Sequence, residues 1–166
     1  MADHRSERMV ALVEKLLTVL IWLNLAFAAL FVFFLVLSFA LADQIHARNI
    51  AISANDLNAT RIAFVIGIFI VPLAHIALER LRAIVRTVRG GDPFVPANAR
   101  RLTAIAWALL GIMILDLAFG IMAAALHTQF GWSFSLTGWL AILLLFVLAR
   151  VFDHGTRLRD DVEGTV

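Results

Sequence analysis

One carboxylate inside an apolar stretch is the residue of this sequence best placed to do chemistry. Asp116 falls near the middle of residues 102–126, whose other side chains are mainly apolar or small. Inserting a charged side chain at such a depth costs about 2.5–3.5 kcal/mol, and such residues usually face the interior of a helix bundle. Two interpretations stay open. Asp116 is either a proton or cation site, or a protonated group that hydrogen-bonds a neighbouring helix.

Two further polar residues lie in apolar stretches. His75 is about one turn from the end of residues 62–78, and Asn24 is about two turns into residues 16–41. At a rise of 1.5 Å per residue, His75 and Asp116 differ in depth by roughly 10 Å or more. We therefore expect a hydrogen bond between Asn24 and His75 rather than a direct pair of His75 with Asp116. Both residues also fit the simpler role of polar contacts that join helices.

No residue pattern predicts catalysis or a cofactor. The chain has no cysteine, which excludes disulfides and thiolate metal sites. It lacks a phosphate-binding glycine loop, a metalloprotease helix signature and a nucleophile elbow. His75 is the one histidine well within a span, so haem held by two histidines is not expected, and His46 with His127 would make only two metal ligands. We predict no enzyme activity, no cofactor, no metal and no direct binding of nucleic acid.

Composition identifies the class of protein. The chain has 166 residues, is 62% hydrophobic and 16% charged, and has a mean hydropathy of +0.92, whereas globular chains are roughly 45–50% apolar and about 25% charged. The apolar residues occur in runs near the ~20 residues that cross a bilayer. We predict an all-α, polytopic membrane protein with a single domain, residues 1–166, and four transmembrane helices in two hairpins. The spans are residues 16–41, 62–78, 102–126 and 132–150. The first run is too long for a signal peptide and is expected to stay as a helix.

Basic residues indicate the orientation. The loop of residues 79–101 lies between the two hairpins and holds six arginines, whereas the polar loop of residues 42–60 has only Arg48. Twelve of the 14 Lys and Arg residues fall on the side of this basic loop and of both termini, including the tail of residues 151–166. The positive-inside rule then predicts that both termini are cytoplasmic.

Glycine and proline predict the local structure around the basic loop. The second helix is expected to continue past residue 78, because apolar residues keep recurring at three- and four-residue spacing. Gly90 and the glycine after it end the helix, and Pro96 restarts one. Within the second span Pro72 predicts a kink, and Ala63 with Gly67 predicts close approach of another helix.

The basic loop presents one face of arginines with two open interpretations. One is adhesion to anionic lipid, worth about 1 kcal/mol per residue near the surface. The other is docking of a cytoplasmic protein on a platform formed by this loop and the extended fourth helix. The residues concerned are Arg82, Arg86, Arg89, Arg100 and Arg101.

Two stretches carry a resemblance to a known family. Residues 91–102, GDPFVPANARRL, followed by Trp107, and residues 143–166, LLLFVLARVFDHGTRLRDDVEGTV, resemble the signatures of the bacterial membrane family called domain of unknown function 2975. The first begins with the turn Gly91, Asp92, Pro93 and Phe94. Three positions depart from the family pattern: Ala97 where an acid is frequent, Arg150 where Glu is common, and Asp153 where Arg or Lys is common. Arg150 and Asp153 could still pair on the helix with reversed signs.

The resemblance implies a bacterial inner-membrane protein without an established enzymatic activity. Members are often encoded beside a small helix-turn-helix regulator, which suggests a membrane anchor or regulator that binds such a protein through its cytoplasmic face. The basic loop and the tail would form this face, the tail with Arg157, Asp160, Asp161 and Glu163. The alternative is a small transporter or proton-coupled permease that uses Asp116 and a cavity shaped by Pro72. A homo-oligomer is compatible with either.

Overall fold

Four long helices make up the protein. The computed structural model describes residues 3–41, 53–90, 94–128 and 131–163. They form α1 (Asp3–Ala40), α3 (Ala54–Arg89), α4 (Pro96–Ala125) and α5 (Leu136–Glu163), and the described residues contain no strand. All four helices are long and apolar enough to cross a membrane. The predicted all-α, multi-pass membrane protein is thereby confirmed.

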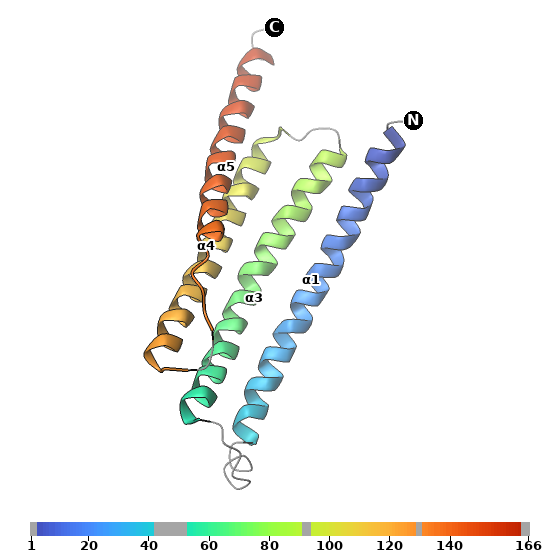
Figure 1. Cartoon of the computed structure of the whole chain (residues 1–166). Helices are drawn as coiled ribbons and strands as arrows, with labels where there is room; N and C mark the ends of the chain where they lie inside the picture. The colour runs from blue at the N-terminus through green and yellow to red at the C-terminus, as the bar shows by residue number, and fades with distance from the viewer. Residues whose placement is uncertain (1–2, 42–52, 91–93, 129–130, 164–166) are drawn as a thin grey trace.

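The helices pack in the order of the chain. In the described part of the molecule α1 contacts α3, α3 contacts α4 and α4 contacts α5, and no other pair of helices touches. Both chain ends and the α3–α4 connection lie at one end of the molecule, the upper end in Figure 1. This end, called the basic end below, carries the described residues of the predicted basic loop. The first helix, α1, and the last, α5, do not touch in the described chain, so the four helices form an open row. Each helix is therefore held only by its neighbours in sequence.

The helix α3 begins earlier than the sequence suggested. Residues 54–60 were predicted as part of a polar loop, and this prediction is wrong, because α3 starts at Ala54. The Ser53 side chain accepts a hydrogen bond from the Asn55 backbone N–H at 3.2 Å and so caps the helix.

This early start of α3 lets its side chains cap both neighbouring helices. Asn55 Nδ2 donates to the Leu126 carbonyl at the end of α4, at 3.1 Å. Arg61 donates to the Ser38 carbonyl at 2.9 Å, and its guanidinium lies 4.2 Å from the ring centre of Phe39. Terminal carbonyls lack helical partners and attract cations, so these contacts stabilise the ends of α1 and α4.

Glycine brings α1 and α3 close together. A Cβ added to Gly67 would lie 2.9 Å from Cε2 of Phe31, so only glycine leaves room for this ring against the α3 backbone. Close approach at Gly67 was predicted, and it is confirmed. Phe31 continues into an aromatic cluster with Phe64, whose ring stacks on Phe34 at 6.0 Å. The helix α3 runs on through Pro72 without a break in its assignment.

The turn between α3 and α4 follows the glycine and proline signals. The helix α3 ends at Arg89, and the Gly90 N–H bonds the Arg86 carbonyl at 3.1 Å. Gly90 is the C-cap residue and has a φ of −73°, in the right-handed helical region. Pro96 then begins α4, as predicted.

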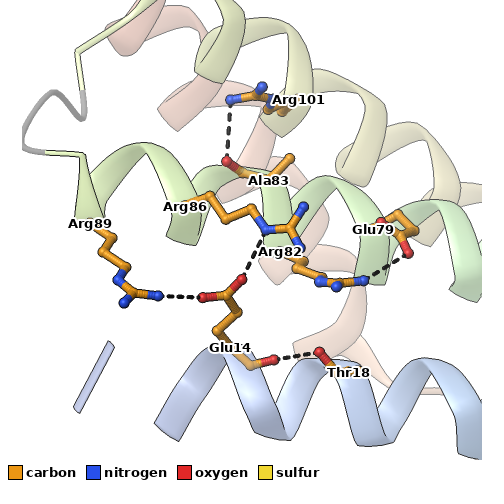
Figure 2. A network of polar contacts seen from close by, with 8 residues as sticks. All are labelled: Glu14, Thr18, Glu79, Arg82, Ala83, Arg86, Arg89 and Arg101. Carbon is orange, nitrogen blue, oxygen red and sulfur yellow. Dashed lines mark hydrogen bonds and ion pairs between the residues drawn. The ribbon is translucent and has the colours of Figure 1, made fainter. Parts of the chain in front are cut away.

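A buried polar cluster joins α3 to α4 just below this turn. Asn98 is fully buried, and its Nδ2 donates to the Thr87 hydroxyl at 2.8 Å. Arg101 donates to Asn98 Oδ1 at 2.8 Å and to the Ala83 carbonyl at 3.3 Å, the second of which is drawn in Figure 2. Thr87 in turn lies 2.6 Å from the Ile84 carbonyl. These side chains satisfy one another where water cannot reach Asn98.

Asn98→Ala should destabilise the protein by about 1–3 kcal/mol, because Thr87 and Arg101 would lose their buried partner. Unfolding of the purified chain in detergent would measure this. Asn58→Ala is the matched control, since Asn58 is exposed, and its effect should stay within about 0.5 kcal/mol. Equal effects of the two substitutions would contradict a structural role for the cluster.

Candidate functional site

The arginines at the end of α3 are held by a carboxylate of α1. Arg86 Nε lies 2.9 Å from one oxygen of Glu14, and an Arg89 nitrogen lies 3.1 Å from the other. Figure 2 shows the two guanidinium groups converging on this single side chain. Glu14 precedes the first predicted span, residues 16–41, by two residues, which puts the cluster beside the predicted membrane boundary. Its contacts join α1 to α3.

Charge at this cluster lowers the pKa of the Glu14 carboxyl. The hydrogen bond from Arg86 is the main cause, and the positive charges of Arg86 and Arg89 add to it. A carboxyl with a lowered folded-state pKa contributes stability above its unfolded pKa and loses it as pH falls through the folded value. The link between α1 and α3 should therefore be intact at neutral pH and weaken in acid.

The predicted basic face is divided among several partners. Arg82 lies 3.4 Å from Glu79, one turn away on the same helix, and its buried Nε has no hydrogen-bond partner in the part of the chain that the structure describes. Arg101 points into the α3–α4 joint. Of the five arginines assigned to the face, only Arg100 makes no ion pair or hydrogen bond within the described chain. Its side chain is exposed.

The polar residues within the spans bond to backbone or to aromatic side chains. Asn24 Nδ2 donates to the Val71 carbonyl at 3.1 Å, next to Pro72. The predicted hydrogen bond between Asn24 and His75 is therefore wrong, and the buried His75 Nδ1 has no hydrogen-bond partner among the described residues. The described contacts do not bring His75 and Asp116 together, in agreement with their predicted difference in depth.

Asp116 is bonded by a tryptophan from the segment before α5. Trp132 Nε1 donates to Asp116 Oδ2 at 3.1 Å. The ring lies against Gly120, where an added Cβ would be only 2.2 Å from Trp132 Cδ2. Any larger residue at position 120 would displace the ring. The fourth span was predicted to begin at residue 132, and this boundary is wrong, because α5 starts at Leu136.

The helix α5 begins beside the middle of α4 rather than beside its end. Gly138 in its first turn lies next to Met113, whose methyl would be 2.9 Å from an added Cβ. From Asp116 the helix α4 continues for about nine residues, or roughly 14 Å, to Ala125. Residues 131–135, which are not helical, cover part of this height, and Figure 1 shows the connection running back along the molecule before α5 begins.

The other end of α5 extends beyond the predicted span. That span was predicted to end at residue 150, and the helix continues through most of the predicted tail to Glu163. The side chains of Asp160, Asp161 and Glu163 lie outside the described ones. Asp153 lies 3.0 Å from Arg157, so the predicted pair of Asp153 with Arg150 is wrong. Spacing of four residues on this helix places Arg157 over Asp153.

Metal ligands do not gather in the described part of the chain. No group of three or more His, Cys, Asp or Glu side chains is found there. His46 lies outside the described residues, so the structure does not place it relative to His127.

Comparison with known protein families identifies the family of this chain. A family model described as "Protein of unknown function (DUF2975)" matches residues 4–166. The chain belongs to this family. No curated protein and no solved structure matches it.

The two stretches that carry the family resemblance meet in space. Phe94, from the first stretch, stacks on Phe152, from the second, with ring centres 5.3 Å apart. The preceding motif residues Gly91, Asp92 and Pro93 lie outside the described residues. Asn98 and Arg101 of the first stretch belong to the buried joint with α3. The motif thus fixes how α3, α4 and α5 meet at the basic end.

Several residues with defined polar roles were absent from the predicted sites. Glu14, Asn98 and Trp132 are three of them. The sequence does offer a signal that Asn98 makes a buried polar contact, because it is a lone amide in the first turn of a helix that becomes apolar within a few residues. No sequence pattern marks Glu14 or Trp132 in this way, since the residues that they bond lie on other helices.

Glu14→Gln should lower the thermal unfolding temperature at neutral pH and leave it unchanged in acid. The wild type and the variant should converge as pH falls through the lowered pKa of Glu14. A pH series of unfolding scans in detergent measures this.

Glu79→Gln is the control for this series, because the ion pair of Glu79 in the described chain is with Arg82 of its own helix. It should change the unfolding temperature little at any pH. A constant difference between wild type and Glu14→Gln across the pH series would show that the carboxylate charge is not involved.

Proposed function

We propose that this protein is a non-enzymatic membrane anchor or regulator that holds a soluble protein at its basic end. The observation that carries the proposal is the projection of α5. Thr156 is only 2% exposed, so the bundle covers the helix to that point, and the helix continues to Glu163. In Figure 1 it extends beyond α3 and α4. Short helical segments without tertiary contacts are marginal in water, so a partner packed on these last turns would stabilise them.

The surface beside this projection is preorganised. The Glu14 cluster joins α1 to α3, and the Asn98 cluster joins α3 to α4. A platform with fixed side chains loses little conformational entropy when a partner binds. Arg86 and Arg89 keep more than half of their side-chain surface exposed while bonded to Glu14. They therefore remain available to an acidic partner surface.

Charge and family resemblance supply the orientation and the partner class. Most Lys and Arg residues are at the basic end, which supports a cytoplasmic position for it in a bacterial inner membrane. The resemblance points to a small helix-turn-helix regulator as the partner. Asp160, Asp161 and Glu163 give the end of α5 the charge that suits the basic surface of a DNA-binding protein.

A photocrosslinker at position 157, incorporated in living bacteria, should capture a small helix-turn-helix protein. Mass spectrometry would identify the product. The same group at position 58, on the opposite end of α3, should not capture it. Replacing Asp160, Asp161 and Glu163 by their amides should abolish capture. Absence of a DNA-binding protein, or capture from position 58 as well, would overturn the proposal.

A permease is the second candidate, and one observation favours it. The helix α5 begins near Asp116, and Trp132, in the non-helical residues before it, bonds Asp116 of α4. Interrupted helices with a terminus at membrane depth form substrate and ion sites in transporters, and non-helical backbone at that depth is tolerated where it is covered by protein or lines a water-filled cavity.

Asp116→Asn separates the two functions. The amide oxygen can still accept the hydrogen bond from Trp132, so the fold should be preserved, but the group no longer titrates. The anchor proposal expects unchanged crosslinking at position 157. Proton flux into proteoliposomes that is present in the wild type and lost in Asp116→Asn would instead establish the permease.

A further inference from the structure

A cavity of about 310 Å³ lies between α4 and α5 at the basic end. Its α4 side is formed by Ala99, Thr103 and Trp107, which recur every four residues and share one face of the helix. On α5, Ala149 also lines the cavity, and Ala99 and Ala149 are each only 4% exposed. The small side chains of these two alanines leave room between the helices where larger residues would close it.

Two arginines at this cavity have no partner in the described chain. Arg100 on α4 and Arg150 on α5 both line it, and neither makes an ion pair or hydrogen bond there. The one acidic lining residue, Asp153, is paired with Arg157 at 3.0 Å. The cavity therefore has an excess of positive charge.

Thr103, the other polar residue that lines the cavity, is not available to donate a hydrogen bond to an anion. The Thr103 hydroxyl donates to the Ala99 carbonyl at 3.0 Å, so its hydrogen is already used. Recognition of an anion would rest on the two guanidinium groups. Guanidinium binds phosphate through two parallel hydrogen bonds, which makes arginine well suited to phosphate groups.

Polarity changes along the length of the cavity. Arg100 and Trp107 are seven residues apart, or about 10 Å along α4. At the deeper end Trp107 and Phe146 pack edge to face with ring centres 5.4 Å apart. Trp107 is 62% exposed in a helix that crosses the membrane. The cavity thus runs from positive charge near the predicted membrane boundary, at residues 102 and 150, to aromatic surface within the hydrocarbon.

We propose that this cavity binds one anionic phospholipid. Arg100 and Arg150 hold the phosphate, and the proximal acyl chain packs on Trp107 and Phe146. Basic pockets between transmembrane helices bind anionic headgroups in this way. A free phosphate ion would use only the charged end, whereas a phospholipid matches both ends, so the lipid is the occupant. The site is separate from the proposed protein-docking surface on the last turns of α5.

Native mass spectrometry of the full chain in a neutral detergent tests the proposal. Titration with phosphatidylglycerol should give a one-lipid complex, and phosphatidylcholine should give much less of it. Arg100→Gln with Arg150→Gln should weaken phosphatidylglycerol binding by about tenfold or more. Inorganic phosphate in large excess should leave the complex intact. Thermal unfolding gives a second readout, since phosphatidylglycerol but not phosphatidylcholine should raise the wild-type unfolding temperature.

A charge-matched control makes the result specific. Arg8→Gln with Arg80→Gln removes two exposed arginines that do not line this cavity, and it should bind phosphatidylglycerol as the wild type does. Trp107→Ala should weaken lipid binding while both arginines remain. Equal binding by the Arg100/Arg150 variant and the wild type would overturn the site. Equal losses in the control variant, or displacement of the lipid by inorganic phosphate, would overturn it as well.

Discussion

Helices in hydrocarbon gain little by burying leucine or phenylalanine against one another, because the lipid tails are equally apolar. Close backbone approach and hydrogen bonds between helices must therefore fix their arrangement. Each joint here has its own polar contact: Asn24 on the Val71 backbone, Asn98 with Thr87, and Asp116 with Trp132. Because each helix touches only its sequence neighbours in the described chain, no joint can take over for another. Loss of one contact should loosen the chain at that joint.

This constraint gives the arginines of the basic end two different uses. Arg86 and Arg101 bond to neighbouring helices and to buried groups, so they hold the fold together. Arg100 and Arg150 have no such partners in the described chain and line a cavity. Neighbours in sequence, such as Arg100 and Arg101, thus point to different sides of one helix. From the sequence, all of these arginines look like one basic surface. The structure shows which of them join helices and which line the cavity.

Hydropathy and the positions of glycine and proline predict features that depend on a single segment, such as the number of helices and the residues at which they end. They gave four helices, the end of α3 at Arg89 and the start of α4 at Pro96. They missed the start of α3, because the Ser53 cap lies among other polar residues. They also placed Trp132 in a helix, since hydropathy does not register a hydrogen bond to Asp116 on another helix. Partners across helices depend on how each helix is rotated, and spacing along one helix does not determine this.

The family signature illustrates the same distinction. Asn98 and Arg101 stand in the first of the two stretches that carry the family resemblance, and both are used in the joint between α3 and α4. Phe94 of that stretch packs on Phe152 of the second. A motif that builds the joint between three helices explains the shared fold without implying a shared ligand. Binding specificity should instead be sought where this chain departs from the pattern. In the α4–α5 cavity Arg150 adds positive charge beside Arg100, and the Glu that the resemblance leads us to expect at this position would remove it.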